Sequence, residues 1–469
     1  MKRIKNLVFA CLILVSFTYL KAGTNKKNKS VTKPNILFIF SDDWGWGDLG
    51  VHGHPYIKTP NIDRLAKEGT DFQRFTVASG VCSPSRSAVM TGQFPARFNV
   101  NGHFAWVNQN EKRNMPDWLD PKEVTIPKLL RKAGYKTAHF GKWHISNNMI
   151  PDSPTPLEYG YDEYGAFNCS GIQMPVHEDA DRTVSFIEKA NEEGKPFFIN
   201  LWVHEPHTPF HVVPKYQQRF PQFDFESSDN IYASVLNHAD ERIGQVLDAL
   251  DRLGLTENTL VIFSSDNGPA GSGEKGQEFK VIYDSATGLG YDSKAARGTT
   301  AGRKGRKHTI YEGGINVPFI ARWPGKIKAN VIDNSSLISA VDLLPTFCDV
   351  AGIKLPKGHN FDGLNQLETL QGKKYSLRKK PLFWKLKTKA AKGKYQYAIM
   401  FENWKMLVAE DGSYLELYDI IKDPYEANNL KDEKTKVVSM LQAKIDAWKK
   451  TLPEKPSSDL FSKLREENK

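Results

Sequence analysis

Two pairs of oxygen-bearing residues in this chain could bind a hard metal cation. Asp42 and Asp43 form one pair, and Asp266 and Asn267 form the other; each pair comes at the end of an apolar run. Adjacent carboxylates repel each other unless a cation is present, although a pair standing alone could equally be an acidic turn. Together the four residues offer three carboxylates and an amide oxygen, which suits Ca²⁺, with Mg²⁺ as the second choice.

A single cysteine stands in the segment VCSPSRSAVMTG, residues 81–92. Cys82 could be a small buried apolar residue, half of a disulfide or a nucleophile. The chain has four cysteines, and Cys11 falls in the apolar N-terminal run, so the other three cannot all pair with one another. This is not a disulfide scaffold, and whether Cys169 and Cys348 pair stays open at this point.

Four apolar segments are typical of buried parallel strands, and polar residues follow each of them. They are Asn35–Phe40, Lys136–Phe140, Phe197–Val203 and Leu260–Phe263. Open α/β sheets place their sites outside the carboxyl ends of the strands, so these segments could deliver side chains to one place. Helical segments such as Thr125–Ala133 and Ile231–Leu250 alternate with the strands, which predicts a doubly wound α/β domain over residues 32–365.

The two ends of the chain differ from this middle part. Basic residues and then an apolar run from Leu7 to Leu20 predict a secretory signal peptide at residues 1–22, with export to the periplasm or the medium and no permanent membrane span. A lipoprotein anchored through Cys11 is the alternative for this end. Short strand-like pieces and an amphipathic helix predict a small antiparallel sheet with a helix over residues 366–469, packed on the first domain.

The charge favours an anionic partner. The formal net charge is +10, and residues 1–22 hold four basic residues and no acid, so the remainder is near +6. No nucleic-acid recognition motif is found and export argues against such a partner, so an anionic extracellular polymer fits better. The run 373–394 has ten Lys or Arg and no acid; it is either a solvated charged face or a cradle for a polyanionic chain.

The segment Cys82–Arg86 matches the C-x-P-S-R signature of the formylglycine-dependent sulfatases. Other segments resemble that family in the same order along the chain: SDDWGWGDLG (Ser41–Gly50), TPNIDRLAKEG (Thr59–Gly69), GKWH (Gly141–His144), EPHTP (Glu205–Pro209), SSDNG (Ser264–Gly268) and GRKHTIYEGGINVP (Gly305–Pro318). PLFW (Pro381–Trp384) and ELYDIIKDPYEANNL (Glu416–Leu430) extend the resemblance to the C-terminal part. An ordered set of this kind is far more specific than any one motif.

The resemblance implies an alkaline-phosphatase-like fold, in which helices flank a doubly wound mixed sheet and a small C-terminal antiparallel sheet with a helix follows. It also implies that a separate maturation enzyme oxidises Cys82 to formylglycine (3-oxoalanine), whose hydrate is the nucleophile, and that Arg86 holds this group. The implied Ca²⁺ ligands are the modified Cys82 together with Asp42, Asp43, Asp266 and Asn267.

The chemistry of a sulfate ester suggests the remaining roles. Lys142 and Lys307 would clamp the sulfate oxygens as positive charges. His207 is the candidate general acid for the leaving alkoxide, and His144 would take the proton that allows sulfate to be expelled.

Four further residues are candidate substrate contacts: His103, His204, Arg303 and Lys304. Lys304 competes with Lys307 for the sulfate clamp, and Lys307 is preferred because it precedes the YEGG sequence by the family's spacing. His103 lies in the loop 99–121, which with the loop 269–304 is expected to set specificity.

These observations predict an exported sulfatase that hydrolyses sulfate monoesters on a sulfated polysaccharide or its oligosaccharides, of the ulvan, carrageenan or glycosaminoglycan type. A formylglycine-dependent phosphodiesterase or phosphonate monoester hydrolase is the first alternative. A non-catalytic sulfated-glycan-binding protein, in which Cys82 is never modified, is an alternative of another class.

Overall fold

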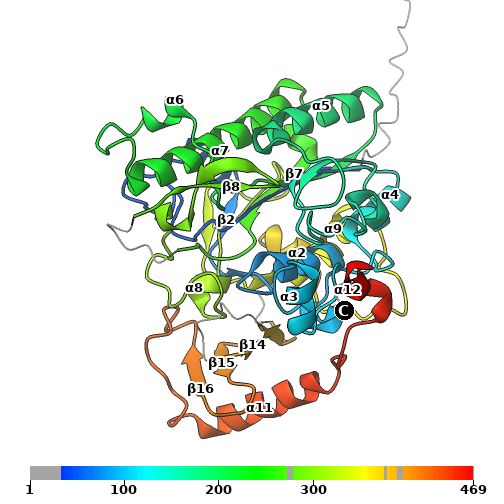
Figure 1. Ribbon diagram of the computed structural model, residues 1–469, viewed down its shortest axis with the longest axis vertical. Coiled ribbons are helices and arrows are strands. Elements are labelled where there is room, and N and C mark those ends of the chain that lie inside the picture. The colour runs from blue at the N-terminus through cyan, green and yellow to red at the C-terminus, as the bar shows by residue number, and fades with distance from the viewer. Residues whose placement is uncertain (1–32, 272–277, 374–377, 388–394, 468–469) are drawn as a thin grey trace, which may run out of the picture. The chain divides into compact units, whose positions relative to one another are not determined.

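The computed structural model describes residues 33–271, 278–373, 378–387 and 395–467 (Figure 1). The predicted signal peptide, Cys11 and much of the basic run 373–394 lie outside the described residues. Residues Lys33–Lys469 form a single compact unit, so the predicted domain boundary at residue 365 stays a prediction. No helix in the described ranges is long and apolar enough to cross a membrane.

An eight-stranded mixed sheet with the order β11-β2-β10-β7-β1-β6-β4-β5 carries the site. The strands are β1 Asn35–Ser41, β2 Thr70–Phe72, β4 Lys136–Lys142, β5 Glu163–Phe167, β6 Phe197–Trp202, β7 Thr259–Ser265, β10 Phe319–Arg322 and β11 Val331–Asp333. The five strands from β7 to β5 are parallel, and β10 runs antiparallel to both of its neighbours. The four strands predicted from apolar runs are β1, β4, β6 and β7, and they lie side by side.

The register of these four strands brings their carboxyl ends to one edge of the sheet. Ser41 at the end of β1 is paired with Ser265 at the end of β7. Gly141 near the end of β4 is paired with Trp202 at the end of β6. The polar residues that follow the strands therefore start from neighbouring positions, as the sequence predicts.

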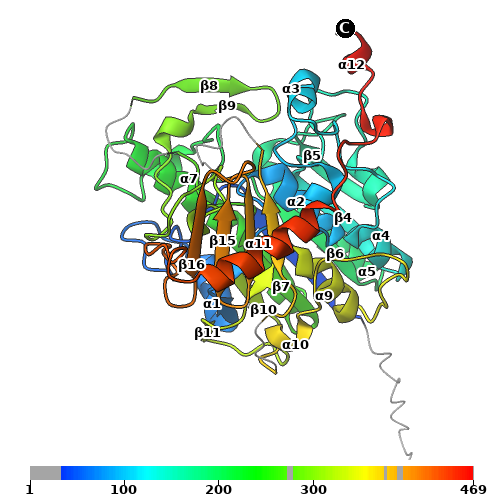
Figure 2. The same ribbon diagram turned by 90° about the horizontal axis from the view of Figure 1, so that it is seen from below.

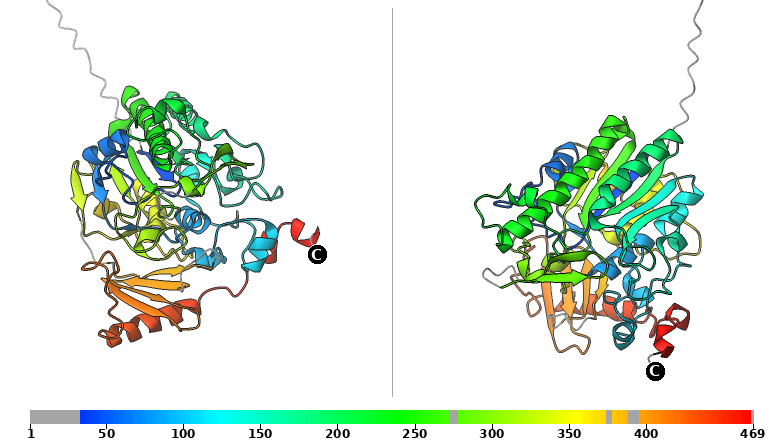
Figure 3. Two further views of the ribbon diagram at one scale, coloured as in Figure 1. Left: turned by 60° about the vertical axis from the view of Figure 1, so that its left-hand side comes forward. Right: turned by 45° about the horizontal axis from the view of Figure 1, so that its top comes forward.

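Helices cover both faces of the sheet, because successive strand residues point to opposite sides (Figures 1 and 3). Leu37 and Ile39 of β1 pack in one core with α1 (Pro60–Glu68), α5 (Asp179–Glu192) and α7 (Ser228–Arg252). Phe38 and its alternate neighbours pack in the other core. That core includes residues of α2 Cys82–Thr91, α4 Ile126–Lys132 and α9 Leu343–Val350. Each such fully buried side chain contributes about 1.5–3 kcal/mol relative to leaving it exposed, so both faces hold β1 firmly.

The C-terminal part forms a four-stranded antiparallel sheet with a helix along it (Figure 2). Its elements are β13 Leu382–Lys385, β14 Tyr397–Phe401, β15 Trp404–Val408, β16 Leu415–Asp419 and α11 Thr435–Lys449. Trp448 of α11 stacks on Phe383 with ring centroids 4.7 Å apart. Trp384 donates a hydrogen bond of 2.8 Å to the carbonyl of Val77, a few residues before Cys82. The predicted sheet and helix are confirmed, with β13 as a strand that the apolar pattern did not predict.

Shorter elements complete the fold. The strands are β3 Phe75–Thr76 paired with β12 Ile338–Ser339, and the hairpin β8 Val281–Asp284 with β9 Gly288–Tyr291. The helices are α3 Val107–Lys112, α6 Pro214–Gln217, α8 Glu312–Ile315, α10 Leu367–Leu370 and α12 Leu464–Glu467. Among the described residues, Cys82, Cys169 and Cys348 are buried and none of them forms a disulfide, so the pairing left open by the sequence does not occur.

Candidate active site

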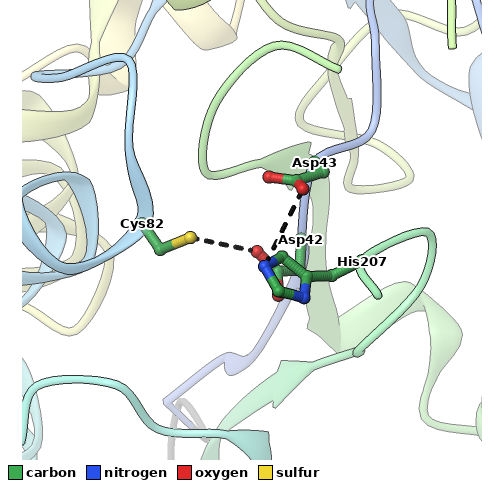
Figure 4. Close-up of side chains that lie close together, drawn as sticks. All are labelled: Asp42, Asp43, Cys82 and His207. Carbon is green, nitrogen blue, oxygen red and sulfur yellow. Dashed lines mark hydrogen bonds and ion pairs between the residues drawn. The ribbon is translucent and has the colours of Figure 1, made fainter. Parts of the chain in front are cut away.

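Cys82 is the first residue of α2 and faces the carboxyl ends of the parallel strands. Its Sγ lies 3.3 Å from Oδ1 of Asp42 (Figure 4). The same atom lies 3.6 Å from Nζ of Lys142. The thiol is buried. Burial and the carboxylates of Asp266 and Asp42 raise the pKa of Cys82 well above the ordinary thiol value. As a thiol it therefore stays protonated, which makes it a poor nucleophile.

Carboxylates and cations alternate around Cys82 in a buried network. Arg86, one turn further along α2, holds Asp266 with Nη2 and Oδ2 2.7 Å apart, and its Nη2 is 3.6 Å from Oδ1 of Asp42. Nζ of Lys142 contacts Asp42 directly. Nζ of Lys307 donates to Oδ2 of Asp43 at 2.7 Å. The amide of Asp43 donates to Oδ1 of Asp266 at 3.2 Å, so these six predicted site residues form one connected cluster with Cys82.

The pKa values of the carboxylates follow from this arrangement. Burial by itself would raise the pKa of Asp42, but the charge of a protonated His207 and that of Lys142 outweigh it and hold the pKa well below the ordinary value. Burial raises the pKa of Asp43, against the opposing charge of Lys307. Burial, followed by repulsion from Asp42, raises the pKa of Asp266 to about 7. Crowded carboxylates of this kind are relieved by an added cation.

The oxygen-bearing residues fit a divalent cation. In the described part of the chain, Oδ1 of Asn267 is buried without a hydrogen-bond partner, while its Nδ2 donates to Oδ1 of Asp43 at 2.7 Å. An orphaned buried acceptor costs about 1–3 kcal/mol, which a bound cation would remove. Asp42, Asp43, Cys82 and His207 each offer one ligand atom, all within 4.8 Å of one another. Asp42, Asp43, Asp266 and Asn267 would hold the ion, and their oxygens favour Ca²⁺ or Mg²⁺ over zinc.

Two glycines allow the loop 305–314 to approach the site. A Cβ on Gly80 would lie 2.1 Å from the carbonyl oxygen of Thr309, and a Cβ on Gly268 would lie 1.9 Å from that of Gly313. The amide of His308 donates to the carbonyl of Gly80 at 2.8 Å. Only glycine permits these contacts, so the segments before Cys82 and after Asn267 position the loop that carries Lys307.

His144 has a defined tautomer. Its Nε2 is 3.0 Å from the carbonyl oxygen of Phe104, which can only accept, so Nε2 carries the proton and Nδ1 is the basic atom of the neutral ring. Burial and then the charge of Lys142 hold the pKa of His144 well below its ordinary value. The backbone of His144 has φ 53°, a left-handed conformation that typically costs about 1–3 kcal/mol in a non-glycine residue and is common at functional sites.

His207 stands over the carboxylates (Figure 4). Its Nδ1 is 3.9 Å from Oδ2 of Asp42, and its Nε2 is 3.9 Å from Oδ2 of Asp43. Nδ1 also lies 2.6 Å from the carbonyl of Thr208, so Nδ1 is the protonated nitrogen of the neutral ring and Nε2 is the one that exchanges a proton. The side chain is 24% exposed, which leaves it accessible from the cavity.

A cavity of about 390 Å³ opens over Cys82, within the range of about 300–1,000 Å³ typical of small-molecule sites. Its lining includes Cys82, His103, His144, His207 and Lys307 of the predicted residues. It also includes residues that were not named as candidates from the sequence, namely Gln109, Asn147, Asn148, Asn168, Asp284 and Ser285. Gln109, Asp284 and Ser285 lie in the two loops expected to set specificity, whereas Asn147, Asn148 and Asn168 follow β4 and β5, where the adjacent amides at 147–148 were the only local signal.

The other three predicted substrate contacts are not among the described residues that line this cavity, because each has an internal partner. His204 is buried, with Nε2 3.0 Å from the carbonyl of Pro209. The guanidinium of Arg303 lies 3.7 Å from the centre of the Trp46 ring. Lys304 donates to the hydroxyl of Tyr418 at 2.8 Å in β16. Of the two competing lysines, the structure therefore places Lys307 at the carboxylates and Lys304 on the C-terminal sheet.

Comparison with known proteins identifies the family. The sequence profile of the Sulfatase family matches residues 34–353. The chain belongs to the sulfatase family. A second profile, "N-sulphoglucosamine sulphohydrolase, C-terminal", matches residues 305–451 and so extends the match into the C-terminal sheet and helix. This sulfatase has the alkaline-phosphatase-like fold that the resemblance implied, and it is a sulfuric ester hydrolase.

Individual relatives agree with the family assignment. An N-acetylgalactosamine-6-sulfatase of Mus musculus is 32% identical over 413 residues, which cover 80% of this chain and 71% of that protein. An N-acetylgalactosamine-6-O-sulfatase of Bacteroides thetaiotaomicron is 26% identical over 523 residues, covering 92% of this chain and 97% of that one. The crystal structure of Ps i-CgsB in complex with k-i-k-neocarrahexaose superposes with a TM-score of 0.77 at 25% identity, covering 93% of this chain and 96% of that one.

Proposed function

We propose that this sulfatase is exported and removes sulfate esters from a sulfated polysaccharide or its oligosaccharides, with formylglycine at position 82 and Ca²⁺ as its cofactors. The observation that carries the proposal is Cys82 itself. It is a buried and protonated thiol at the floor of a cavity, 3.3 Å from Asp42, within the C-S-P-S-R sequence that a maturation enzyme would recognise. Unmodified, such a thiol lacks the nucleophilic character that the site needs.

The cofactors would supply two things that the side chains do not. The hydrated aldehyde at position 82 would supply a hydroxyl nucleophile, and a bound Ca²⁺ would polarise a sulfate oxygen and favour ionisation of that hydroxyl. The ligand oxygens of Asp42 and Asp43 and the unpartnered Oδ1 of Asn267 support the metal, and Asp266 adjoins them by accepting a hydrogen bond from the amide of Asp43. Mg²⁺ is the second choice for the same oxygen set.

The chain's own residues would bind the charged ester and move protons. Lys142 pairs with Asp42 and Lys307 pairs with Asp43. Both ammonium groups would bind the sulfate oxygens as fixed positive charges. Arg86 holds Asp266 and approaches Asp42, and so fixes the carboxylates beneath the nucleophile. In its imidazolium form His207 carries a proton on Nε2 as well as on Nδ1, and it would donate the Nε2 proton to the leaving sugar oxygen. Nδ1 of His144 would accept a proton at position 82.

The glycan class rests on relatives and on the cavity wall. The N-acetylgalactosamine-6-sulfatases and Ps i-CgsB, whose structure holds a neocarrahexaose, are similar over most of this chain. The amide side chains of Gln109, Asn147, Asn148 and Asn168 line the same cavity and could hydrogen-bond sugar hydroxyls. Both observations favour a glycosaminoglycan or carrageenan over a simple aryl sulfate.

The test is sulfate release from a panel of glycosaminoglycans, carrageenans and ulvan and from their oligosaccharides. The protein is co-expressed with a maturation enzyme, aldehyde at position 82 is verified by mass spectrometry, and Cys82→Ala is the control. Release from one glycan that is abolished in Cys82→Ala is the expected result. An aldehyde-bearing protein that releases no sulfate but cleaves phosphodiesters or phosphonate monoesters would overturn the proposal.

A further inference from the structure

A second cluster of metal-binding side chains lies outside the catalytic cavity. His177 precedes α5, Glu205 follows β6, and His238 lies in α7. Each offers one ligand atom, and these atoms lie within 4.8 Å of one another. The rings of His177 and His238 are 4.3 Å apart, and Nε2 of His177 is 3.2 Å from Oε1 of Glu205.

Within the described ranges, two imidazole nitrogens of this cluster lack hydrogen-bond partners, and Nε2 of His177 has Oε1 of Glu205 as a neighbour at ion-pair distance. Across the described residues, Nε2 of His177 and Nδ1 of His238 are buried and make no hydrogen bond. His238 is only 8% exposed, so solvent does not satisfy it freely. Nε2 of His211, whose ring centroid is 6.1 Å from that of His177, is in the same situation. Several orphaned nitrogens facing one carboxylate are costly unless a cation binds them.

The carboxylate is held as a metal ligand would be. Oε2 of Glu205 accepts from Nη2 of Arg242 at 2.6 Å, and Nε of Arg242 donates to Asp179 at 2.9 Å. The carboxylates of Asp179 and Glu205 carry two negative charges against the one positive charge of Arg242, which leaves one negative charge for a cation to balance. Hydrogen bonds of this kind orient ligating carboxylates in metal sites. Oε1 of Glu205, on the side of His177, also accepts from Arg242 at 3.1 Å but keeps a second lone pair for a cation.

We propose that His177, Glu205 and His238 form a second metal site, selective for Zn²⁺ or a similar first-row cation. Two imidazoles and one carboxylate favour such ions, whereas Ca²⁺ prefers oxygen ligands alone. Bond lengths of about 2.0–2.2 Å put the ligand atoms of a tetrahedral zinc site about 3.3–3.5 Å apart. The 3.2 Å between Nε2 of His177 and Oε1 of Glu205 is about 0.1 Å short of this spacing. The ligand nitrogen of His238, within 4.8 Å of both, would have to come closer to complete the site.

The site is accessible and close to the catalytic segment. A cavity of about 790 Å³ is lined by His177, His238 and Arg242, and the His177 side chain is 31% exposed, so an ion can enter and keep an open coordination position. Glu205 stands two residues before His207, and its carbonyl accepts from the amide of Asp42 at 3.5 Å. A bound cation would therefore stiffen the segment that carries His207.

The experiment is a Co²⁺ and Zn²⁺ titration of the full chain without a histidine tag, in the Cys82→Ala background and with saturating Ca²⁺. These conditions remove the catalytic thiol as a ligand and occupy the oxygen site. Co²⁺ is followed by its visible absorption and displaced by Zn²⁺. One equivalent is expected to bind, and His177→Gln is expected to weaken it by more than the roughly 10–100-fold that loss of a mere supporting partner costs.

Two further variants keep the result decisive. His238→Gln should weaken binding in the same way, and circular dichroism verifies that each variant is folded. His359→Ala removes an exposed imidazole elsewhere and should leave the affinity unchanged. Absence of Co²⁺ binding under these conditions, or equal affinity in folded His177→Gln and His238→Gln, would refute the second site.

Discussion

Replacing His207 should slow the hydrolysis of sugar sulfates far more than that of an aryl sulfate. A sugar alkoxide leaves with difficulty unless a proton is delivered to it, whereas a nitrophenolate leaves unaided. His207 is placed to deliver that proton. Its Nδ1 is tied to the carbonyl of Thr208 at 2.6 Å, which leaves Nε2 for the substrate, and its side chain lines the cavity over Cys82.

The size of the effect can be bounded. General acid catalysis contributes about 10²–10⁴-fold, so His207→Ala should raise the barrier for the sugar ester by about 2.7–5.4 kcal/mol, at about 1.36 kcal/mol per factor of ten. For the aryl ester, His207→Ala should remove only the electrostatic contribution of His207 to the rate. That contribution comes from its ring nitrogens, which lie 3.9 Å from Oδ2 of Asp42 and of Asp43. At this separation and partial exposure we expect about tenfold or less, or about 1.4 kcal/mol.

The assay compares kcat/KM for a sulfated oligosaccharide and for 4-nitrophenyl sulfate with the same enzyme preparations. His207→Ala and His207→Gln are measured beside His359→Ala, whose exposed imidazole does not line the cavity. Aldehyde content is matched by mass spectrometry. If both substrates lose the same factor, His207 acts through the charge of the site alone and the assignment as general acid is wrong.

Three other outcomes are expected. Removing the metal with a calcium chelator should abolish activity, and added Ca²⁺ should restore it. Asn267→Ala removes the unpartnered buried oxygen, so it should raise the Ca²⁺ concentration needed for half-maximal activity, measured by titration. Burial raises the pKa of Asp48 from 3.8 to about 7. The unfolded chain therefore loses this proton at a lower pH than the folded protein, and the folded state loses up to about 4 kcal/mol of stability as the pH rises from 3.8 to 7. Asp48→Asn lacks this ionisation, so its melting temperature should depend less on pH over that range. Arg465 donates two hydrogen bonds to the buried carboxylate of Asp117. Arg465→Ala should therefore lower the free energy of unfolding, measured by urea titration, by about 3–5 kcal/mol. An unchanged urea midpoint would show that this contact of the C-terminal segment does not stabilise the fold.

The sequence by itself determined four adjacent strands of the central sheet and the polar residues that follow them. Continuous apolar runs occur where a strand is buried on both faces, and β1, β4, β6 and β7 are the four strands predicted in that way. Polar residues directly after such runs must lie at the carboxyl edge of the sheet. The positions of Asp42 and Asp266 therefore followed from local pattern alone, and the ordered motifs assigned the family.

Side chains on loops depended on the tertiary structure. The tautomer of His144 is set by the carbonyl of Phe104, and no local pattern relates these two residues. His177, Glu205 and His238 meet only because α5, β6 and α7 pack together. Contacts between segments distant in the sequence leave no periodic signal, since they depend on the register and packing of whole elements.

Lys304 and Lys307 illustrate the difference between what local sequence and what tertiary structure decides. Lys304 and Lys307 have the same side chain and stand three residues apart, and spacing alone could only rank them. In the structure Lys307 donates to Asp43 at 2.7 Å, whereas Lys304 donates to Tyr418, more than a hundred residues further along the chain. A long flexible cation pairs with whichever acceptor the fold brings within reach, and only the packing of the C-terminal sheet decided which lysine remained at the catalytic site.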